Sequence, residues 1–190
     1  MWEWLGDALP IDFANTIHRR AAEDLDMLRD GGDLAEWARR QHGQVPVPSA
    51  GAAQARLAEV RELRDDVRAL LHAAEAGEPL PADARHHVND RARALPLVAQ
   101  LGERPGERRL LPATAADEID ELLAGVAAAT IELVGSGAPL AFCDAPSCGG
   151  FFTPTRANQR WCGDACGTRA RVARHAARHG RHERRRADAR

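Results

Sequence analysis

Residues 143–166 read CDAPSCGGFFTPTRANQRWCGDAC and contain all four cysteines of the chain. Their spacing is C-x4-C-x13-C-x3-C, which is two close pairs separated by a short span. A tetrahedral zinc site made only of cysteines needs this arrangement, because each pair folds around one side of the ion. The spacing therefore predicts one structural Zn²⁺ with four ligands, namely Cys143, Cys148, Cys162 and Cys166. Four cysteines leave no open position for a substrate, so we do not expect a catalytic metal.

The residues around the two pairs fit a small zinc finger. Gly149 and Gly150 allow a tight turn after the first pair, and the aromatic residues that follow can supply a miniature core. The second pair lies where a long helical pattern begins. The free N–H groups and the positive dipole end of a helix N-terminus favour thiolates there. These features predict a treble-clef-like finger. Disulfide bonds are the alternative, but chains inside the cell rarely keep them.

The segment after the last cysteine carries a stripe of arginines at helical spacing. Successive members are three or four residues apart, so one helix face carries Arg171, Arg174, Arg178, Arg181 and Arg185. Like charges at these steps repel each other by roughly a few tenths of a kcal/mol per pair. A bound anion would remove this repulsion. Phosphates would do so, because the guanidinium fork binds them in a bidentate manner. Duplex nucleic acid is the partner that this stripe predicts. The alternative is docking on an acidic protein surface, in this chain or in a partner.

Charge is unevenly distributed along the 190 residues. Residues 1–142 contain 15 Arg and 24 acidic residues, whereas residues 143–190 contain 11 Arg and 4 acidic residues. The formal net charge of −2 therefore divides into −9 and +7. Such an asymmetry indicates that the basic part meets a polyanion. The chain has no Lys, so every basic residue is Arg.

Apolar periodicity predicts a mainly helical N-terminal part. Composition points the same way, because Ala and Arg both favour helix. The clearest helices run over residues 54–76 and 115–134, and a shorter one over 83–95. A β-hairpin is expected over 97–101 and 108–111. Residues 9–17 fit either a strand or a first helix. Asp33 is expected to cap a helix that follows the turn at residues 30–33.

Several function classes are not expected. No stretch approaches the roughly 18 apolar residues that a membrane span requires. The N-terminus lacks the basic and then apolar pattern of a secretory signal, so we expect a cytoplasmic protein. The chain has no G-x-G-x-x-G, phosphate-binding-loop lysine or G-x-S-x-G pattern, so we do not expect an enzyme.

Three further motifs resemble the CGNR-type zinc finger, namely Phe151-Phe152-Thr153, Arg160-Trp161-Cys162 and Cys166-Gly167-Thr168-Arg169-Ala170-Arg171. Residues 9–16, LPIDFANT, resemble the opening of the ABATE domain that commonly precedes this finger. The resemblance covers nearly the whole chain and implies a bacterial, DNA-binding, stress-induced transcription regulator. It assigns the four cysteines as ligands and Arg169 as the motif arginine, which we add to the expected nucleic-acid contacts. Thr168 stands where the motif has Asn, and three residues separate the last two cysteines where some members have four.

We therefore expect an α+β protein, mainly α, in two parts. Residues 1–140 form a mainly helical, ABATE-like domain that senses a small-molecule effector or forms a homodimer. Residues 141–190 form the zinc finger with its arginine-rich helix. The leading function is a DNA-binding transcriptional regulator. The alternatives are a protein-interaction adaptor and a small-molecule-binding protein whose finger is purely structural.

Overall fold

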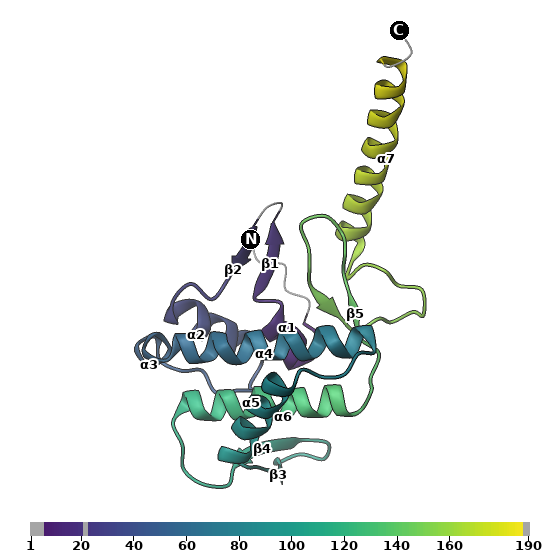
Figure 1. The fold of residues 1–190 in the computed structure, drawn as a ribbon. Helices are drawn as coiled ribbons and strands as arrows, with labels where there is room; N and C mark the ends of the chain where they lie inside the picture. The colour runs from purple at the N-terminus through teal and green to yellow at the C-terminus, as the bar shows by residue number, and fades with distance from the viewer. Residues whose placement is uncertain (1–5, 21–22, 188–190) are drawn as a thin grey trace.

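The computed structural model describes the backbone of residues 6–20 and 23–187, and the side chains of residues 6–18 and 24–178. A helical body forms the N-terminal part, and a small finger leads into a long helix that projects away from it (Figure 1). The helices are α1 (Leu9–Ala14), α2 (Gly31–Arg40), α3 (Ala50–Ala55), α4 (Leu57–Ala76), α5 (Ala82–Ala94), α6 (Glu118–Gly135) and α7 (Asp164–Ala187). The strands form three antiparallel hairpins: β1 (Ile17–Arg20) with β2 (Glu23–Asp26), β3 (Leu97–Leu101) with β4 (Arg108–Pro112), and β5 (Ala141–Phe142) with β6 (Phe151–Phe152). The mainly helical fold and the four-cysteine finger predicted from the sequence are confirmed.

The core of the body lies between α1, α4, α5 and α6. Both predicted apolar faces are confirmed, since each is buried along its helix. In α4 the buried members are Leu57, Val60, Leu63, Val67, Leu70 and Leu71, and in α6 they are Ile119, Leu122, Leu123, Val126 and Thr130. The hairpin predicted at residues 97–111 is present, and it packs beside α6. In the described part of the chain, no helix is long and apolar enough to span a bilayer.

The prediction of one helix over residues 54–76 is wrong at its start. Two helices meet at Arg56, whose φ of −118° leaves the helical range. Ser49 caps α3, because its Oγ accepts from the N–H of Ala52 at 3.2 Å. The guanidinium of Arg56 then binds Glu59 in α4 and Asp120 in α6. This contact between distant segments of the same chain favours the break between the helices. Local apolar periodicity does not reveal it.

The start of α2 also differs from the expectation. Asp30, and not Asp33, is the N-cap, since its side chain accepts from the Asp33 N–H at 3.0 Å. The carboxylate of Asp33 instead binds the guanidinium of Arg29 at 2.8 and 3.0 Å. Gly31 follows the cap because a Cβ there would lie 2.2 Å from the carbonyl oxygen of Ala50 in α3. The segment at residues 9–17, which fitted either a strand or a helix, begins as helix α1. Pro10 lies in its first turn, where a backbone N–H has no partner within the helix and can be absent without loss.

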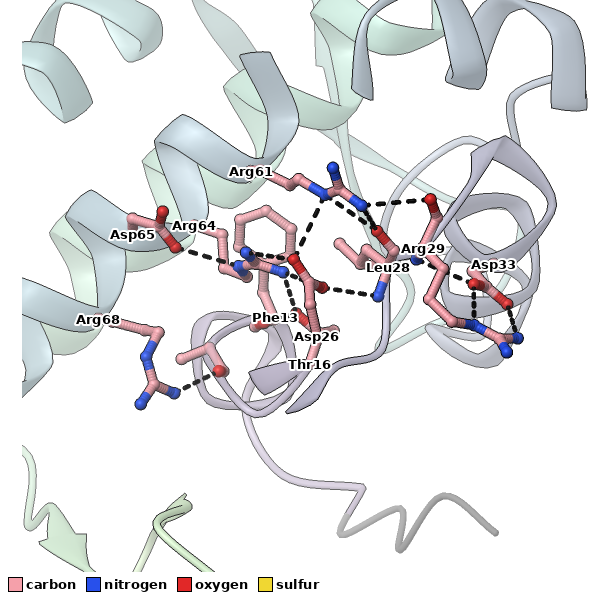
Figure 2. A network of polar contacts seen from close by, with 11 residues as sticks. Phe13, Thr16, Asp26, Leu28, Arg29, Asp33, Arg61, Arg64, Asp65 and Arg68 are labelled. Carbon is pink, nitrogen blue, oxygen red and sulfur yellow. Dashed lines mark hydrogen bonds and ion pairs between the residues drawn. The ribbon is translucent and has the colours of Figure 1, made fainter. Parts of the chain in front are cut away.

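A buried arginine ties the β1–β2 hairpin to α4 (Figure 2). The Arg64 side chain is 3% exposed, and its guanidinium binds both carboxylate oxygens of Asp26 at 2.7 and 3.0 Å. Arg61, one turn earlier, donates to the carbonyl oxygen of Leu28 at 3.0 Å through Nε. Burial of Asp26 opposes its ionisation, but the hydrogen bonds and charge of Arg64 outweigh this and lower its pKa. The hairpin is therefore held by a charge pair more than by apolar packing.

We predict that Asp26→Asn lowers the free energy of unfolding by about 1–3 kcal/mol at pH 7. The substitution leaves the buried Arg64 guanidinium with only the longer ion pair to the exposed Asp65, at 3.3 Å. Since the native pKa lies below 3.8, the wild-type advantage is present above pH 3.8 and is lost as the pH falls below that value. Urea unfolding of both proteins across this range measures the difference.

Asp90→Asn is the control, because Asp90 forms an exposed ion pair with Arg93. This substitution should lower the free energy of unfolding by less than about 0.5 kcal/mol. Equal costs for the two variants would contradict the structural role of the Asp26–Arg64 pair.

Candidate metal centre and nucleic-acid interface

The first cysteine pair lies at the turn between β5 and β6. The Cys143 N–H donates to the Gly150 carbonyl at 2.8 Å, and the Gly149 N–H donates to the Cys143 carbonyl at 3.1 Å. Gly149 has φ +72°, a left-handed conformation that favours glycine, as the sequence predicted for this turn. The turn places the buried side chains of Cys143 and Cys148 on one side.

The second cysteine pair lies at the start of α7. Cys162 precedes the helix by two residues, and Cys166 lies in its first turn, where the sequence placed this pair. Arg169 lies one turn further along, and its Nη2 donates to the Cys166 sulfur at 2.8 Å. The motif arginine therefore faces the cysteine cluster, whereas the sequence placed it among the nucleic-acid contacts.

The four sulfur atoms form a compact group that fits one zinc ion. They all lie within 4.8 Å of one another, with Cys148–Cys162 at 3.7 Å and Cys162–Cys166 at 3.4 Å. A Zn–S distance of about 2.3 Å in a tetrahedron places the sulfurs about 3.8 Å apart. These separations exceed the roughly 2.05 Å of a disulfide bond, and all four thiols are free. Among the described side chains, this is the one group of His, Cys, Asp and Glu residues with metal-binding geometry.

The thiols also have the electrostatics of a cation site. Hydrogen bonds from Cys148 and Cys162 lower the pKa of Cys143, so that thiol ionises first. Hydrogen bonds to Cys143 raise the pKa values of Cys148 and Cys162, because their protons are shared with the thiolate. A divalent cation that replaces these protons allows all four sulfurs to be thiolates.

The finger is anchored to the body by the side chain of Asn15, at the end of α1. Its Nδ2 donates to the Phe151 carbonyl at 2.9 Å, and its Oδ1 accepts from the Phe151 N–H at 2.8 Å. The amide thus pairs with β6 as a neighbouring strand would, and both residues are buried. We refer to this pair of hydrogen bonds as the Asn15–Phe151 junction. Sequence analysis missed it, although a polar Asn in the apolar segment 9–17 was a visible signal.

Aromatic packing surrounds the junction. The Phe151 ring belongs to the main core of the body, while Phe152, on the other face of β6, packs with the cysteines. His72 of α4 contacts Phe151 and Phe142, with ring centroids 4.6 and 4.8 Å away. Arg68, also in α4, places its guanidinium 5.7 Å from the Phe151 ring centre. The two residues of β6 therefore belong to different parts of the protein: Phe151 to the core of the body and Phe152 to the metal centre.

A second contact between body and finger lies beside the junction. Asp7 accepts from the N–H and the Oγ1 of Thr153, both at 2.7 Å. The Asp7 N–H in turn donates to the buried carboxyl of Asp12 at 3.2 Å. Burial raises the pKa of Asp12 to about 7, so a rise in pH through this value places a second negative charge beside Asp7.

The arginine stripe lies on α7, which leads away from the body (Figure 1). Arg171, Arg174 and Arg178 are exposed, and none of the ion pairs found among the described side chains includes them. Arg171 donates to the Thr168 hydroxyl at 2.9 Å, and Arg174 donates to the Ala170 carbonyl at 3.2 Å. For Arg181 and Arg185 the helical backbone is described, but their side chains lie outside the described part of the chain.

Two family models match the chain. The model named ABATE, described as "Putative stress-induced transcription regulator", matches residues 7–137. The model described as "CGNR zinc finger" matches residues 140–179. No curated protein matches the chain. Both resemblances seen in the sequence are thus confirmed, and the finger has a site for one structural zinc ion.

We predict that Asn15→Ala lowers the free energy of unfolding of the zinc-loaded chain by about 2–6 kcal/mol. The substitution leaves the buried N–H and carbonyl of Phe151 without partners, and each costs about 1–3 kcal/mol. Urea unfolding at neutral pH measures the loss.

Asn158→Ala serves as the matched control, since Asn158 is exposed in the finger loop. Its substitution should lower the free energy of unfolding by less than about 0.5 kcal/mol. If the two asparagine variants unfold at the same urea concentration, the junction does not carry the anchoring role.

Proposed function

The chain belongs to the ABATE family and carries a CGNR zinc finger, and from this premise we propose that it is a transcriptional regulator that binds duplex DNA through α7. The observation that carries the proposal is the exposed row of Arg171, Arg174 and Arg178 on a helix that leads away from the body. An α-helix fits the major groove, which is about 12 Å wide. In this proposal zinc is structural, because four cysteines fill its coordination shell, and the chain is not an enzyme.

The electrostatics of α7 support phosphate as the target. From Arg171 to Arg178 the stripe rises two turns, about 10 Å, with three guanidinium groups on one face. Arg174 is also held 5.7 Å from the Trp161 ring centre, so its position is fixed before any ligand binds. Arginines held in place lose less side-chain entropy on binding phosphates than mobile ones. The residues from 143 onward carry +7, which attracts a polyanion over a longer range.

Docking of α7 on the acidic body of the same chain has less support. The body carries −9 over residues 1–142, yet its ion pairs with described partners lie within residues 26–120. The helix instead extends outward from the finger (Figure 1). The arrangement favours a partner outside the chain, and the family favours DNA over an acidic protein.

The body supports a regulatory role through an open cavity of about 840 Å³. It lies between α6, the β3–β4 hairpin and the loop after α2, with Gln44, Leu110 and Glu121 among its lining residues. This volume lies in the range of small-molecule sites. In our proposal an effector would bind here. The homodimer, the bacterial origin and the cytoplasmic location stay predictions from the sequence.

We predict that the zinc-loaded wild type binds a random-sequence duplex with affinity that falls steeply with salt. With about five phosphate contacts, the slope of log K against log salt is about −4 to −5. The triple variant Arg171→Ala, Arg174→Ala and Arg178→Ala should bind more weakly, with a slope shallower by about 2.7. Fluorescence anisotropy across several salt concentrations measures both slopes.

The control is Arg85→Ala, Arg93→Ala and Arg104→Ala, which removes the same charge from exposed positions of the body outside the proposed effector cavity. Its slope should match that of the wild type. Equal slopes for the two triple variants, or no duplex binding by the wild type at low salt, would contradict the proposed function. Bound zinc and far-UV circular dichroism confirm that each variant is folded.

A further inference from the structure

A cleft of about 350 Å³ lies between the loop of residues 153–163 and the first turns of α7. The loop runs outward from β6 and returns at the base of the helix (Figure 1). Three arginines line the cleft: Arg156 and Arg160 from the loop, and Arg171 from the helix. The sequence analysis identified only the last of these.

The positive charges in this cleft lack acidic partners. No ion pair among the described side chains includes Arg156, Arg160 or Arg171, and the lining contains one acidic residue, the exposed Asp164. Three guanidinium groups that line one cleft repel one another unless an anion lies between them. Each guanidinium also presents a planar fork of donors that suits two phosphate oxygens. The composition of the cleft therefore favours an oxyanion.

Hydrogen bonds within the loop fix its shape. The Gln159 Oε1 accepts from the N–H and the hydroxyl of Thr155 at 2.9 and 3.1 Å. Its Nε2 donates to the carbonyl of Trp161 at 3.1 Å. Gln159 thus closes the loop from both sides and holds the arginines that flank it near the helix. A loop held in this way requires little reordering when a ligand enters.

Gly167 lines the inner wall of the cleft together with Arg171 and Trp161. A Cβ at Gly167 would lie 3.5 Å from Arg171 Nη1 and 3.6 Å from Trp161 Cε3, which is ordinary van der Waals contact. The Trp161 ring also connects the cleft to the arginine stripe, since Arg160 and Arg174 lie 5.8 and 5.7 Å from its centre. One nucleic-acid strand can therefore contact the loop and the helix together.

We propose that this cleft binds a phosphodiester group of the DNA backbone, held by Arg156, Arg160 and Arg171. The inference rests on the proposed DNA binding and deepens it by adding the loop as a second contact surface beside α7. The three side chains contact the backbone and not base edges, so the cleft contributes affinity and orientation but no sequence preference.

The test compares two double variants of the zinc-loaded full chain. Arg156→Ala with Arg160→Ala removes the loop side of the cleft, and the body variant, Arg85→Ala with Arg104→Ala, removes the same charge from exposed positions outside both cavities. Anisotropy of a random-sequence duplex is measured against salt. We expect the cleft variant to lose up to about 0.9 of log–log slope, since the three arginines hold one phosphate and each phosphate contact contributes about 0.9. We expect the body variant to keep the wild-type slope.

The outcomes separate this inference from the proposed function. Wild-type duplex binding together with an unchanged slope in the cleft variant would overturn the inference and leave the proposed function intact. No duplex binding by the wild type would overturn both. The exposed side chain of Arg156 allows a milder variant, Arg156→Gln, which keeps the test open if the double variant loses zinc. Its duplex affinity at low salt should fall, because the phosphate keeps only two of its three guanidinium partners, and an unchanged affinity would overturn the inference.

Inorganic phosphate at constant ionic strength distinguishes a DNA phosphodiester from a free phosphate as the anion in the cleft. A backbone phosphodiester predicts that phosphate displaces duplex more readily from the wild type than from the cleft variant. Saturable phosphate binding that needs Arg156 and Arg160 but leaves duplex binding unchanged would overturn the assignment to DNA and place a free phosphate in the cleft.

Discussion

The Asn15–Phe151 junction is the interaction on which the rest of the structure depends. One side-chain amide at the end of α1 satisfies both main-chain groups of a buried residue 136 positions away. Without it, β6 would bury an N–H and a carbonyl with no partners, which is costly. The Phe151 ring can enter the main core only because its backbone is satisfied in this way. The finger is therefore built onto the body and not merely joined to it by a linker.

This arrangement links the metal centre to the direction of α7. The zinc ligands on the β5–β6 turn are fixed by hydrogen bonds that surround Phe151, and Phe152 packs directly with the cysteines. The other ligand pair lies at the start of α7, with Arg169 donating to the Cys166 sulfur. When bound, zinc would connect the anchored turn to the helix. The orientation of the arginine stripe relative to the body is then set by the metal centre and the junction together.

The sequence predicts those parts of this account that depend on local spacing. The cysteine pairs, the apolar faces of α4 and α6, the hairpin at residues 97–111 and the arginine stripe all follow from periodicity. The features it missed depend on contacts between distant segments. The junction was missed because the partner of Asn15 is 136 residues away. Arg169 was placed with its charged neighbours because spacing does not show that it faces a sulfur. The break at Arg56 depends on acids in α6, and the cleft depends on how Gln159 closes its loop.

Hydrogen exchange of the full chain, with zinc bound and after chelation, tests this account most directly. If the junction couples the metal centre to the body, removal of zinc should speed exchange in α1 and around His72 of α4 as well as in residues 141–187. These segments contact Phe151, whose position depends on the zinc-bound turn. Faster exchange confined to residues 141–187, with the body unchanged, would contradict the account and show that the finger opens independently.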